Sequence, residues 1–402
     1  MNRLDYAAAL GMFVYASSVV ATPIILLQIA AELEFGLAQG GGIEAVRAGF
    51  LLAILVASGF AAAKFGMVRS LGTGAVVLAA GLVAYAAAPS YTVVLGAIVL
   101  VGLGGGILEA LLNPLVQDLH PQDSGRYLNI LNAFFSFGVV AAVLVVGDLI
   151  TRGVSWRVLM LGLAALAAVS GLLFFAFGRF AKRDTHVHAA PHTDRSPLQR
   201  LREIMRDRRL LPFAVAMFCG GGVEGGFLFW SASYIQLNFD TLARAGALGT
   251  AVFAGGMVVG RVASGHFVRQ DRLIVLIVIS ACLGVAAGFG AWAVQTLEAF
   301  IAAMFCAGLA TACFWPSIQS HAAAEMDVDS TMLFILLSCA GIPGFGLVSW
   351  LMGVIADVSN LRTSLLVLPV LLIVLVIAML TSRSMGGPAV VGGYKKAPGQ
   401  RR

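Results

Sequence analysis

Long apolar runs follow one another along the chain and are separated by short segments that hold charged or turn-forming residues. Twelve runs come close to the roughly 20 residues that a helix needs to cross a hydrocarbon core of about 30 Å. They cover residues 8–31, 44–65, 70–88, 92–117, 129–151, 156–179, 212–236, 245–268, 273–294, 298–321, 331–356 and 363–382. The runs are continuous rather than alternating at every second position, which argues against a transmembrane barrel. The pattern predicts an all-α polytopic membrane protein with 12 transmembrane helices.

Composition and charge add a topology to this prediction. Of the 402 residues 59% are apolar and 11% charged, and the mean hydropathy of +0.93 excludes an ordinary soluble domain. Because Lys and Arg concentrate in cytoplasmic loops, we expect both termini in the cytoplasm of a bacterium whose inner membrane holds the chain. No cleaved signal peptide is expected, since the first run is full length. Five of the 26 Lys and Arg residues fall on the other side: Arg47, Arg152, Arg157, Arg244 and Arg362.

A polar stretch at residues 180–212 divides six spans from six. We expect an N-terminal six-helix bundle at 1–180, a cytoplasmic linker at 181–211, a C-terminal six-helix bundle at 212–383 and a cytoplasmic tail at 384–402. The second part of the linker has the pattern of a basic amphipathic helix on the membrane surface, with Leu198, Leu201, Ile204 and Met205 on its apolar face. Three linker histidines (His186, His188 and His192) lack the rigid spacing of a metal site.

The two halves show a weak internal repeat at an offset of 206 residues. Gly102-Leu103 aligns with Gly308-Leu309, Gly138 with Gly344, and Gly147 with Gly353. The matches fall in equivalent spans, as two parallel six-helix repeats require.

Two carboxylates fall inside predicted spans, Glu109 in the fourth and Glu224 in the seventh; the other acidic residues fall in loops or near span ends. An ionisable group at that depth is costly unless it is paired, protonated or in contact with water, so both are candidates for proton coupling. A protonated glutamic acid that only bonds a neighbouring helix is the structural alternative. Asn113 lies four residues after Glu109 and therefore on the same helix face.

Other polar and aromatic residues near mid-depth are candidates for solute binding, because small-molecule sites combine apolar and aromatic walls with a few placed polar groups. For gating we consider Arg261, which lies near the end of its span, together with the helix breakers Gly341 and Pro343. The five cysteines have no paired spacing, and the chain has no catalytic triad, phosphate loop or metal motif. We therefore expect no enzyme activity, no cofactor and no metal. The further solute-binding candidates are Thr22, Asn113, Asn129, Asn132, Trp230, Tyr234, Trp315 and Gln319.

Twelve spans in two halves resemble the major facilitator superfamily. The loop after the second predicted span, GFAAAKFGMVRSLG, has the frame of the superfamily motif Gly-x-x-x-Asp-Arg-x-Gly-Arg-Arg. Gly59 and Gly66 match, and Lys64 and Arg69 keep positive charge, but Ala63 stands in place of the Asp.

A more specific resemblance is to the fucose permease group of proton symporters for fucose, galactose and glucose. Residues 106–138 are similar to the group's Leu-Glu-Thr-Ala-Ala-Asn-Pro stretch and the segment after it. The seventh predicted span is similar around Gly222 and Glu224, and the eleventh shares Gly341, Pro343, Gly353 and Asp357. In the first of these segments the matching residues are Leu108, Glu109, Asn113, Pro114, Ser124, Gly125, Arg126, Leu128, Asn129, Ser136, Phe137 and Gly138.

The chain departs from this group at two positions. Thr22 stands before Pro23 where the group has an Asp that shares proton handling, and Phe135 stands where an Asn helps to link proton and sugar. The resemblance then implies that coupling depends on Glu109, with Glu224 as a second site.

These features predict a secondary transporter that carries a neutral hexose or deoxyhexose together with protons by alternating access. Three alternatives remain: an exporter of amphiphilic compounds by proton antiport, an uncoupled sugar facilitator, and a membrane sensor that has lost transport. The expected partners are the solute, protons and the lipid bilayer. We expect a monomer that does not bind nucleic acid, since the net charge of +6 comes from cytoplasmic loops and the tail.

Overall fold

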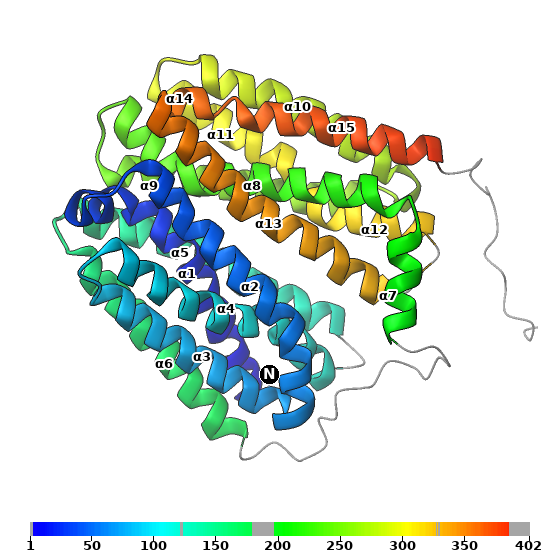
Figure 1. Ribbon diagram of the computed structural model, residues 1–402, viewed down its shortest axis with the longest axis horizontal. Helices are drawn as coiled ribbons and strands as arrows, with labels where there is room; N and C mark the ends of the chain where they lie inside the picture. The colour runs from blue at the N-terminus through cyan, green and yellow to red at the C-terminus, as the bar shows by residue number, and fades with distance from the viewer. Residues whose placement is uncertain (1–2, 121–123, 179–196, 327, 329, 386–402) are drawn as a thin grey trace, which may run out of the picture.

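The computed structural model describes residues 3–120, 124–178, 197–326, 328 and 330–385. In the first half each long apolar run becomes one helix (Figure 1). These helices are α1 (Arg3–Leu33), α2 (Leu37–Phe65), α3 (Met67–Ala86), α4 (Tyr91–Leu119), α5 (Ser124–Thr151) and α6 (Trp156–Gly178).

The second half repeats this arrangement with two of its spans interrupted. It contains α8 (Leu210–Asn238), α9 (Ala243–Phe267), the short 3-10 helix η1 (Gln270–Arg272), α10 (Leu273–Ala293), α11 (Leu297–Thr311), α12 (Phe314–Met326), α13 (Ser330–Val358), α14 (Leu361–Ser364) and α15 (Val367–Met385). Within the part of the chain that the structure describes, eleven segments are long and apolar enough to cross a membrane, and α2, with 29 residues, is the twelfth helix of comparable length. The predicted all-α fold with 12 helices is confirmed.

Local sequence explains where two of the helices stop. Gly66 separates α2 from α3 and has φ +87°, a backbone conformation that side chains disfavour, so the retained motif glycine is needed for the turn. The predicted span 298–321 is instead broken at Ala312 and Cys313, between α11 and α12. Pro316 accounts for the break, because it has no N–H to donate to the carbonyl group of Ala312 four residues earlier.

The amphipathic helix expected in the linker is present as α7 (Pro197–Arg206). Ile204 is buried against the protein, whereas Met205 is 64% exposed. Arg209, just after α7, donates to the Glu325 carbonyl oxygen of α12 at 2.5 Å, and its guanidinium holds the pKa of Asp207 below the usual range. The side chains of Leu198 and Leu201, and His186, His188 and His192, lie outside the described residues.

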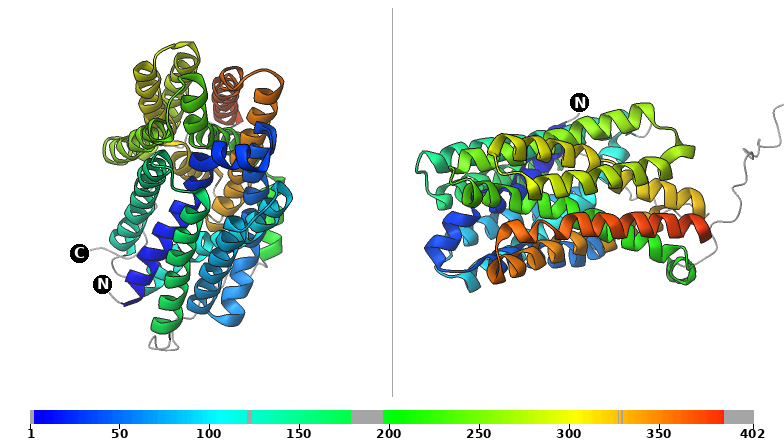
Figure 2. Two further views of the ribbon diagram at one scale, coloured as in Figure 1. Left: turned by 90° about the vertical axis from the view of Figure 1, so that its left-hand side faces the viewer. Right: turned by 90° about the horizontal axis from the view of Figure 1, so that it is seen from above.

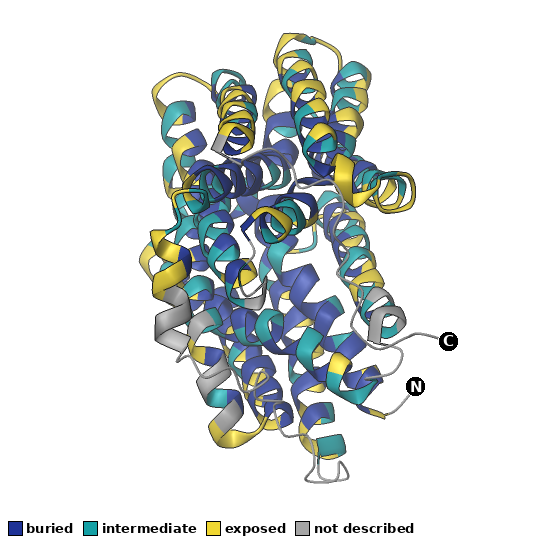
Figure 3. Ribbon diagram, turned by 90° about the vertical axis from the view of Figure 1, so that its right-hand side faces the viewer, coloured by how far each residue is buried: buried dark blue, intermediate teal, exposed yellow. Residues whose placement is uncertain are grey.

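The helices form two bundles, α1–α6 and α8–α15, which meet at one end of the molecule (Figures 1 and 2). At this closed end, formed by residues 36–48 and 346–357, a Cβ on Gly353 of α13 would lie 2.4 Å from the Leu37 carbonyl oxygen of α2. Toward the other end, which carries the start of α1 and is called the terminal end below, the ribbons of α2 and α13 diverge. Buried residues face the inside of the bundles, and exposed apolar residues cover the outer helices (Figure 3).

Glycine contacts show the predicted repeat in three dimensions. Gly102 of α4 faces the carbonyl oxygen of Arg47 in α2, and Gly308 of α11 faces that of Phe253 in α9. Each residue of the second contact lies 206 positions after its counterpart in the first. The same offset relates the contact of Gly147 in α5 with the start of α9 to the contact of Gly353 in α13 with the start of α2. The halves are thus structural repeats, and small residues recur where backbones touch.

Gly104→Ala tests whether backbone contact holds α4 in place. A Cβ on Gly104 would lie 2.4 Å from the Leu78 backbone nitrogen in α3, so we expect a loss of roughly 1–3 kcal/mol in stability, seen as a lower thermal unfolding midpoint in detergent. Gly96→Ala in the same helix is the control, because nothing lies within 4 Å of its Cβ position. Equal midpoints for the two variants would contradict the packing argument.

Candidate functional site

A buried ion pair lies inside the N-terminal bundle. Arg47 of α2 donates from Nε to Glu44 Oε2 at 2.9 Å and from a terminal nitrogen to Glu44 Oε1 at 2.5 Å. Glu44 is 1% exposed and Arg47 8%. Removing one partner of such a pair costs roughly 3–5 kcal/mol, compared with 0–1 kcal/mol for an exposed pair. Loss of either partner should therefore destabilise the N-terminal bundle.

Tyr15 of α1 lies near both this pair and Glu109 of α4. The charges of Glu109 and Arg47 both act on its hydroxyl group. The ring of Tyr15 fits against α4 because Gly105 has no side chain; a Cβ there would lie 3.3 Å from two ring carbons. Glu44, Arg47, Tyr15 and Glu109, called the N-terminal polar cluster below, thus join three helices.

Glycines position α4 within this cluster. Gly102 and Gly106 face α2, Gly104 faces α3, and Gly105 faces Tyr15 of α1. Since α4 can approach three neighbours at once, Glu109 is held within reach of side chains from both α1 and α2. The glycine-rich segment of α4 thus permits close helix approach.

Asn113 follows Glu109 by one turn of α4 and is partly buried. Its Oδ1 atom is enclosed and has no hydrogen-bond partner among the described residues. A buried acceptor without a partner is costly, so this oxygen is suited to a hydrogen bond from a solute or water.

A second polar group lies in the C-terminal bundle. Arg261 of α9 is 3.6 Å from Glu224 Oε1 of α8, and its Nε donates to the carbonyl oxygen of Ala312 at 3.4 Å. That carbonyl is available because Pro316 supplies no N–H. Glu224 also interacts with Trp315, while its Oε2 atom is buried without a partner in the described part of the chain. Arg261 therefore pairs with Glu224.

Trp315 and Gln319 both contact α13. Gly341 accommodates the Trp315 ring, since a Cβ there would lie 2.6 Å from a ring carbon. Gln319 donates to Ser338 Oγ at 3.1 Å, one turn from Gly341. Pro343 lies inside α13, where the helix continues to Val358. The structure thus brings Glu224, Arg261, Trp315 and Gly341 together; a gating role for Gly341, Pro343 and Arg261 stays a prediction.

The other proposed solute contacts lie elsewhere in this conformation. Trp230 is fully buried, and its indole N–H donates to the Ser349 carbonyl oxygen of α13 at 2.9 Å. Tyr234 is also fully buried and packs on Phe300 with ring centroids 4.6 Å apart. Thr22 is 5% exposed and lies beside Tyr85 inside the N-terminal bundle. All three contribute to packing between helices here.

Two of the candidate solute-binding residues lie on α5. Asn132 is exposed and donates to the Leu128 carbonyl oxygen of its own helix at 2.8 Å. The side chain of Asn129 is outside the described residues.

Sequence reasoning missed Glu44 and Arg47. The apolar run begins at residue 44, which predicts Arg47 on the exterior side of the membrane and Glu44 at a span end. The helix begins earlier, at Leu37, so both side chains lie well inside it. The Glu-x-x-Arg spacing, which places both charges on one helix face, was the available signal.

The closed end is held at two places by hydrogen bonds that cross between the bundles. Asp357 of α13 accepts from the backbone N–H groups of Leu37 and Ala38, each at 2.9 Å, at the start of α2. Thr151 of α5 accepts from the N–H of Arg244 at 2.9 Å, at the start of α9. Thr151 and Arg244 are related to Asp357 and Ala38 by the 206-residue offset. Each bundle therefore caps a helix of the other.

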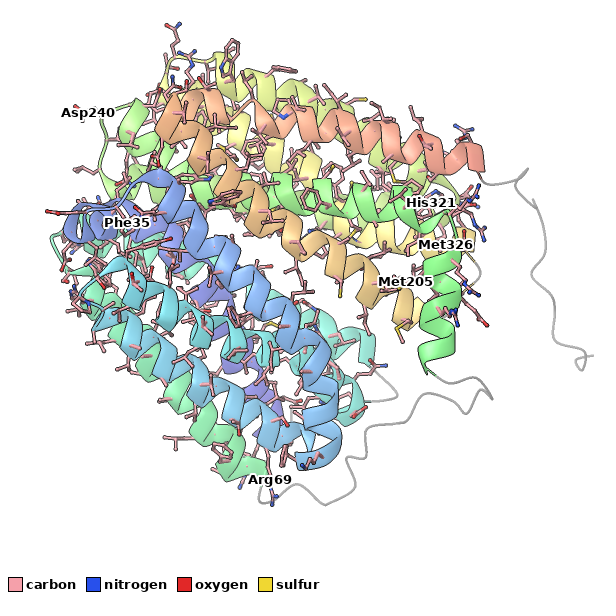
Figure 4. All side chains as sticks on the ribbon, viewed as in Figure 1. Phe35, Arg69, Met205, Asp240, His321 and Met326 are labelled. Carbon is pink, nitrogen blue, oxygen red and sulfur yellow. The ribbon has the colours of Figure 1, made fainter. Side chains whose placement is uncertain are left out.

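The terminal end shows no comparable approach of the labelled residues (Figure 4). Phe35 and Asp240, from different bundles, lie at the closed end, whereas Arg69 and Met326 lie at separate corners of the molecule. The two bundles are thus joined at the capped end.

A family model of the Major Facilitator Superfamily matches residues 7–324, most of the chain. The chain belongs to the major facilitator superfamily. Membrane protein MosC of Rhizobium meliloti is 25% identical over 338 residues, which cover 83% of this chain and 79% of MosC. The superfamily assignment makes the chain an integral membrane transporter, and members of this superfamily bind small-molecule solutes within the membrane.

Solved superfamily structures share the fold. A bacterial homologue of the human lysosomal transporter Spinster, inward-facing and unoccupied, aligns with a TM-score of 0.77 and 16% identity over 94% of this chain and 97% of its own. The nucleoside transporter NupG aligns with a TM-score of 0.75 and 14% identity over 95% and 98%. These comparisons identify the superfamily. Membership of the fucose permease group within it stays a prediction.

Asp357→Ala tests the cap at the closed end. Losing an N-cap acceptor costs roughly 0.5–2 kcal/mol, so the population separated at this end should rise on the order of tenfold. The native cysteines are first replaced, and new cysteines are introduced at the exposed positions Ser90 and Val358, one in each bundle. Spin labels on these cysteines report the separation as a distance distribution measured by double electron–electron resonance.

Glu298→Ala is the matched control, because it removes an exposed acid from the same end of the molecule. An Asp357→Ala distance distribution identical to that of the control would contradict a role for the cap.

Proposed function

We propose that the chain is a proton-coupled importer of a neutral sugar, a hexose or deoxyhexose, in which Glu109 carries the proton. The observation that carries this proposal is the placement of Glu109 on α4, near Tyr15 and the Arg47 charge and one turn from Asn113 Oδ1, which has no hydrogen-bond partner among the described residues. A carboxyl group so placed can exchange a proton while a neighbouring amide contacts solute.

Further support comes from the likeness of residues 106–138 to the fucose permease group. Glu109 and Asn113 occupy the positions of that group's Glu and Asn. Thr22 replaces its Asp on α1, so Glu109 has to carry coupling without that partner. Glu224, paired with Arg261, is the second candidate proton site.

For the solute we assign Asn113 from one bundle and Glu224, Trp315 and Gln319 from the other. Trp315 offers a ring to the C–H face of a sugar, and the amides and the carboxyl group offer hydrogen bonds to hydroxyl groups. Trp230, Tyr234 and Thr22 are left out because each is buried between helices. Because Trp315 contacts Gly341, we assign α13 as the helix that couples solute binding to gating.

Alternating access follows from the two-bundle arrangement. We assign the rigid bodies to residues 1–180 and 212–383, with the linker at 181–211, and place both termini in the cytoplasm of a bacterial cell because Lys and Arg residues concentrate on that side. The end toward which the α2 and α13 ribbons diverge then lies on the cytoplasmic side (Figure 1). Rocking of the two bundles about the central site would open the closed end and expose the site to the other side.

Glu109→Gln in proteoliposomes tests the proposal. Labelled hexoses, deoxyhexoses and one nucleoside are supplied with and without an inward proton gradient. Wild-type protein should accumulate one of the sugars above equilibrium, and Glu109→Gln should reach equilibrium only, because a neutral amide cannot carry the proton. Counterflow exchange should persist in the variant.

Glu298→Gln is the control for removing an exposed acid. Sugar that equilibrates regardless of the gradient would establish an uncoupled facilitator and contradict coupling. Transport of the nucleoside alone would contradict the sugar assignment.

A further inference from the structure

A histidine and a carboxylate meet at the terminal end of the N-terminal bundle. His120, directly after α4, places its Nε2 atom 2.8 Å from Asp5 Oδ1 in the first turn of α1. Its ring also stacks on Tyr127 of α5, with ring centroids 3.5 Å apart and planes 3° from parallel. The side chains of His120 and Asp5 are only 17% and 4% exposed. These three residues, called the terminal clasp below, join α1, α4 and α5 and lie outside both the N-terminal polar cluster and the proposed solute site.

The two helix ends are complementary to the charges of the clasp. Asp5 lies where the first N–H groups of α1 have no intrahelical acceptor, and a helix start favours a negative charge. His120 lies at the end of α4, where its backbone N–H bonds to the Val116 carbonyl oxygen at 3.2 Å, and a helix end favours a positive charge. The ring of Tyr127 also attracts a cation placed against it. An imidazolium at His120 is therefore held by three helices at once.

Apolar packing beneath the clasp is incomplete. A cavity of about 10 Å³ lies between α1, α4 and α5, with room for about one water molecule. Besides Asp5 and Tyr127, its lining is apolar: Ala9, Val116, Ile130, Leu131 and Phe134. Because the side chains leave this space between the helices, the polar contact of the clasp contributes to holding their ends together.

Few other charges face the clasp among the described residues. Arg3 shares the first turn of α1 and is exposed, and Asp118 lies near the end of α4 and is half-buried. Tyr127 is the titratable group that α5 contributes. The end of α6, residues 171–178, contains no charged residue. An imidazole is the side chain that ordinarily changes charge between about pH 5 and 8, so His120 is the group of the clasp suited to respond in that range.

We propose that Asp5 and His120 form a proton-sensitive clasp. When His120 is protonated, its ion pair with Asp5 holds the ends of α1, α4 and α5 together. When the proton leaves, the attraction between opposite charges is lost, one hydrogen bond remains, and the helix ends separate more readily. The ligand of this site is thus a proton.

The clasp is a second protonation site, distinct from Glu109. His120 follows Glu109 by 11 residues, about 16 Å along a helix that rises 1.5 Å per residue. The clasp requires neither a solute nor Glu109, so it goes beyond the proposed function; only the side it faces, the cytoplasm, rests on the proposed topology. Because α4 carries Glu109 and Asn113 and ends at the clasp, the pH at this end bears on the packing of that helix.

The test measures how far the ends of α1 and α4 separate at two pH values. Full-length protein in lipid membranes, with the native cysteines replaced, carries spin labels at the exposed positions Tyr6 of α1 and Gln117 of α4. Distances between the labels are measured by electron paramagnetic resonance without solute, at about pH 5 and about pH 8, with the same pH on both sides of the membrane. In the wild type the distances should be longer and more broadly distributed at the higher pH.

Two substitutions assign this response to the clasp. His120→Gln keeps an N–H donor for Asp5 but carries no charge, and Asp5→Asn removes the carboxylate, so each should show the broad distribution at both pH values. His266→Gln is the matched control, because it removes an exposed histidine at the same end of the other bundle, and it should respond as the wild type does.

A purely structural contact would broaden the distribution in both variants while the wild type stayed unchanged between the two pH values. That result would overturn the proposal, and so would a wild-type response that persists in His120→Gln. Sugar uptake enters neither measurement. Loss of the proposed function would therefore leave the clasp standing, and loss of the clasp would leave Glu109 as the proposed proton carrier.

Discussion

The arrangement depends on backbone-to-backbone contact between helices. Within a bilayer apolar side chains gain little by leaving lipid, so helices associate through close packing at small residues. Gly102, Gly104 and Gly105 bring α4 against α2, α3 and α1, and that approach places Glu109 beside Tyr15. Gly308, the repeat equivalent of Gly102, packs α11 against α9 in the same way. The polar chemistry is thus positioned by residues that have no side chain.

The two bundles share a scaffold but differ in chemistry at equivalent positions. At the 206-residue offset Glu109 corresponds to Trp315 and Asn113 to Gln319. One bundle therefore presents an acid where the other presents an aromatic ring, while both keep an amide one turn further along. In the C-terminal bundle the acid lies instead on α8, where Glu224 meets Arg261. Equivalent backbones therefore carry different side chains, and each bundle places its acid on a different helix.

Hydrophobic periodicity was sufficient to predict the helices, and the glycine matches were sufficient to predict the repeat, because both depend on local composition. The polar cluster was not predictable in the same way. Assigning the second span from residue 44 placed Glu44 and Arg47 at the membrane boundary, since the amphipathic start of α2 contains Gly and Gln. The sequence places Trp230 and Tyr234 on one helix. The neighbours that their side chains contact depend on tertiary packing, which the sequence pattern does not contain.

The caps at the closed end constrain how the bundles can move. Opening this end removes Asp357 from the start of α2 and Thr151 from the start of α9, which leaves helix N–H groups without acceptors until water or new partners replace them. Because the two caps lie at positions related by the repeat, a rotation that breaks one also strains the other. The capping bonds are exposed, so water can replace them as this end opens. The two caps therefore favour the arrangement described here without preventing the rearrangement that alternating access requires.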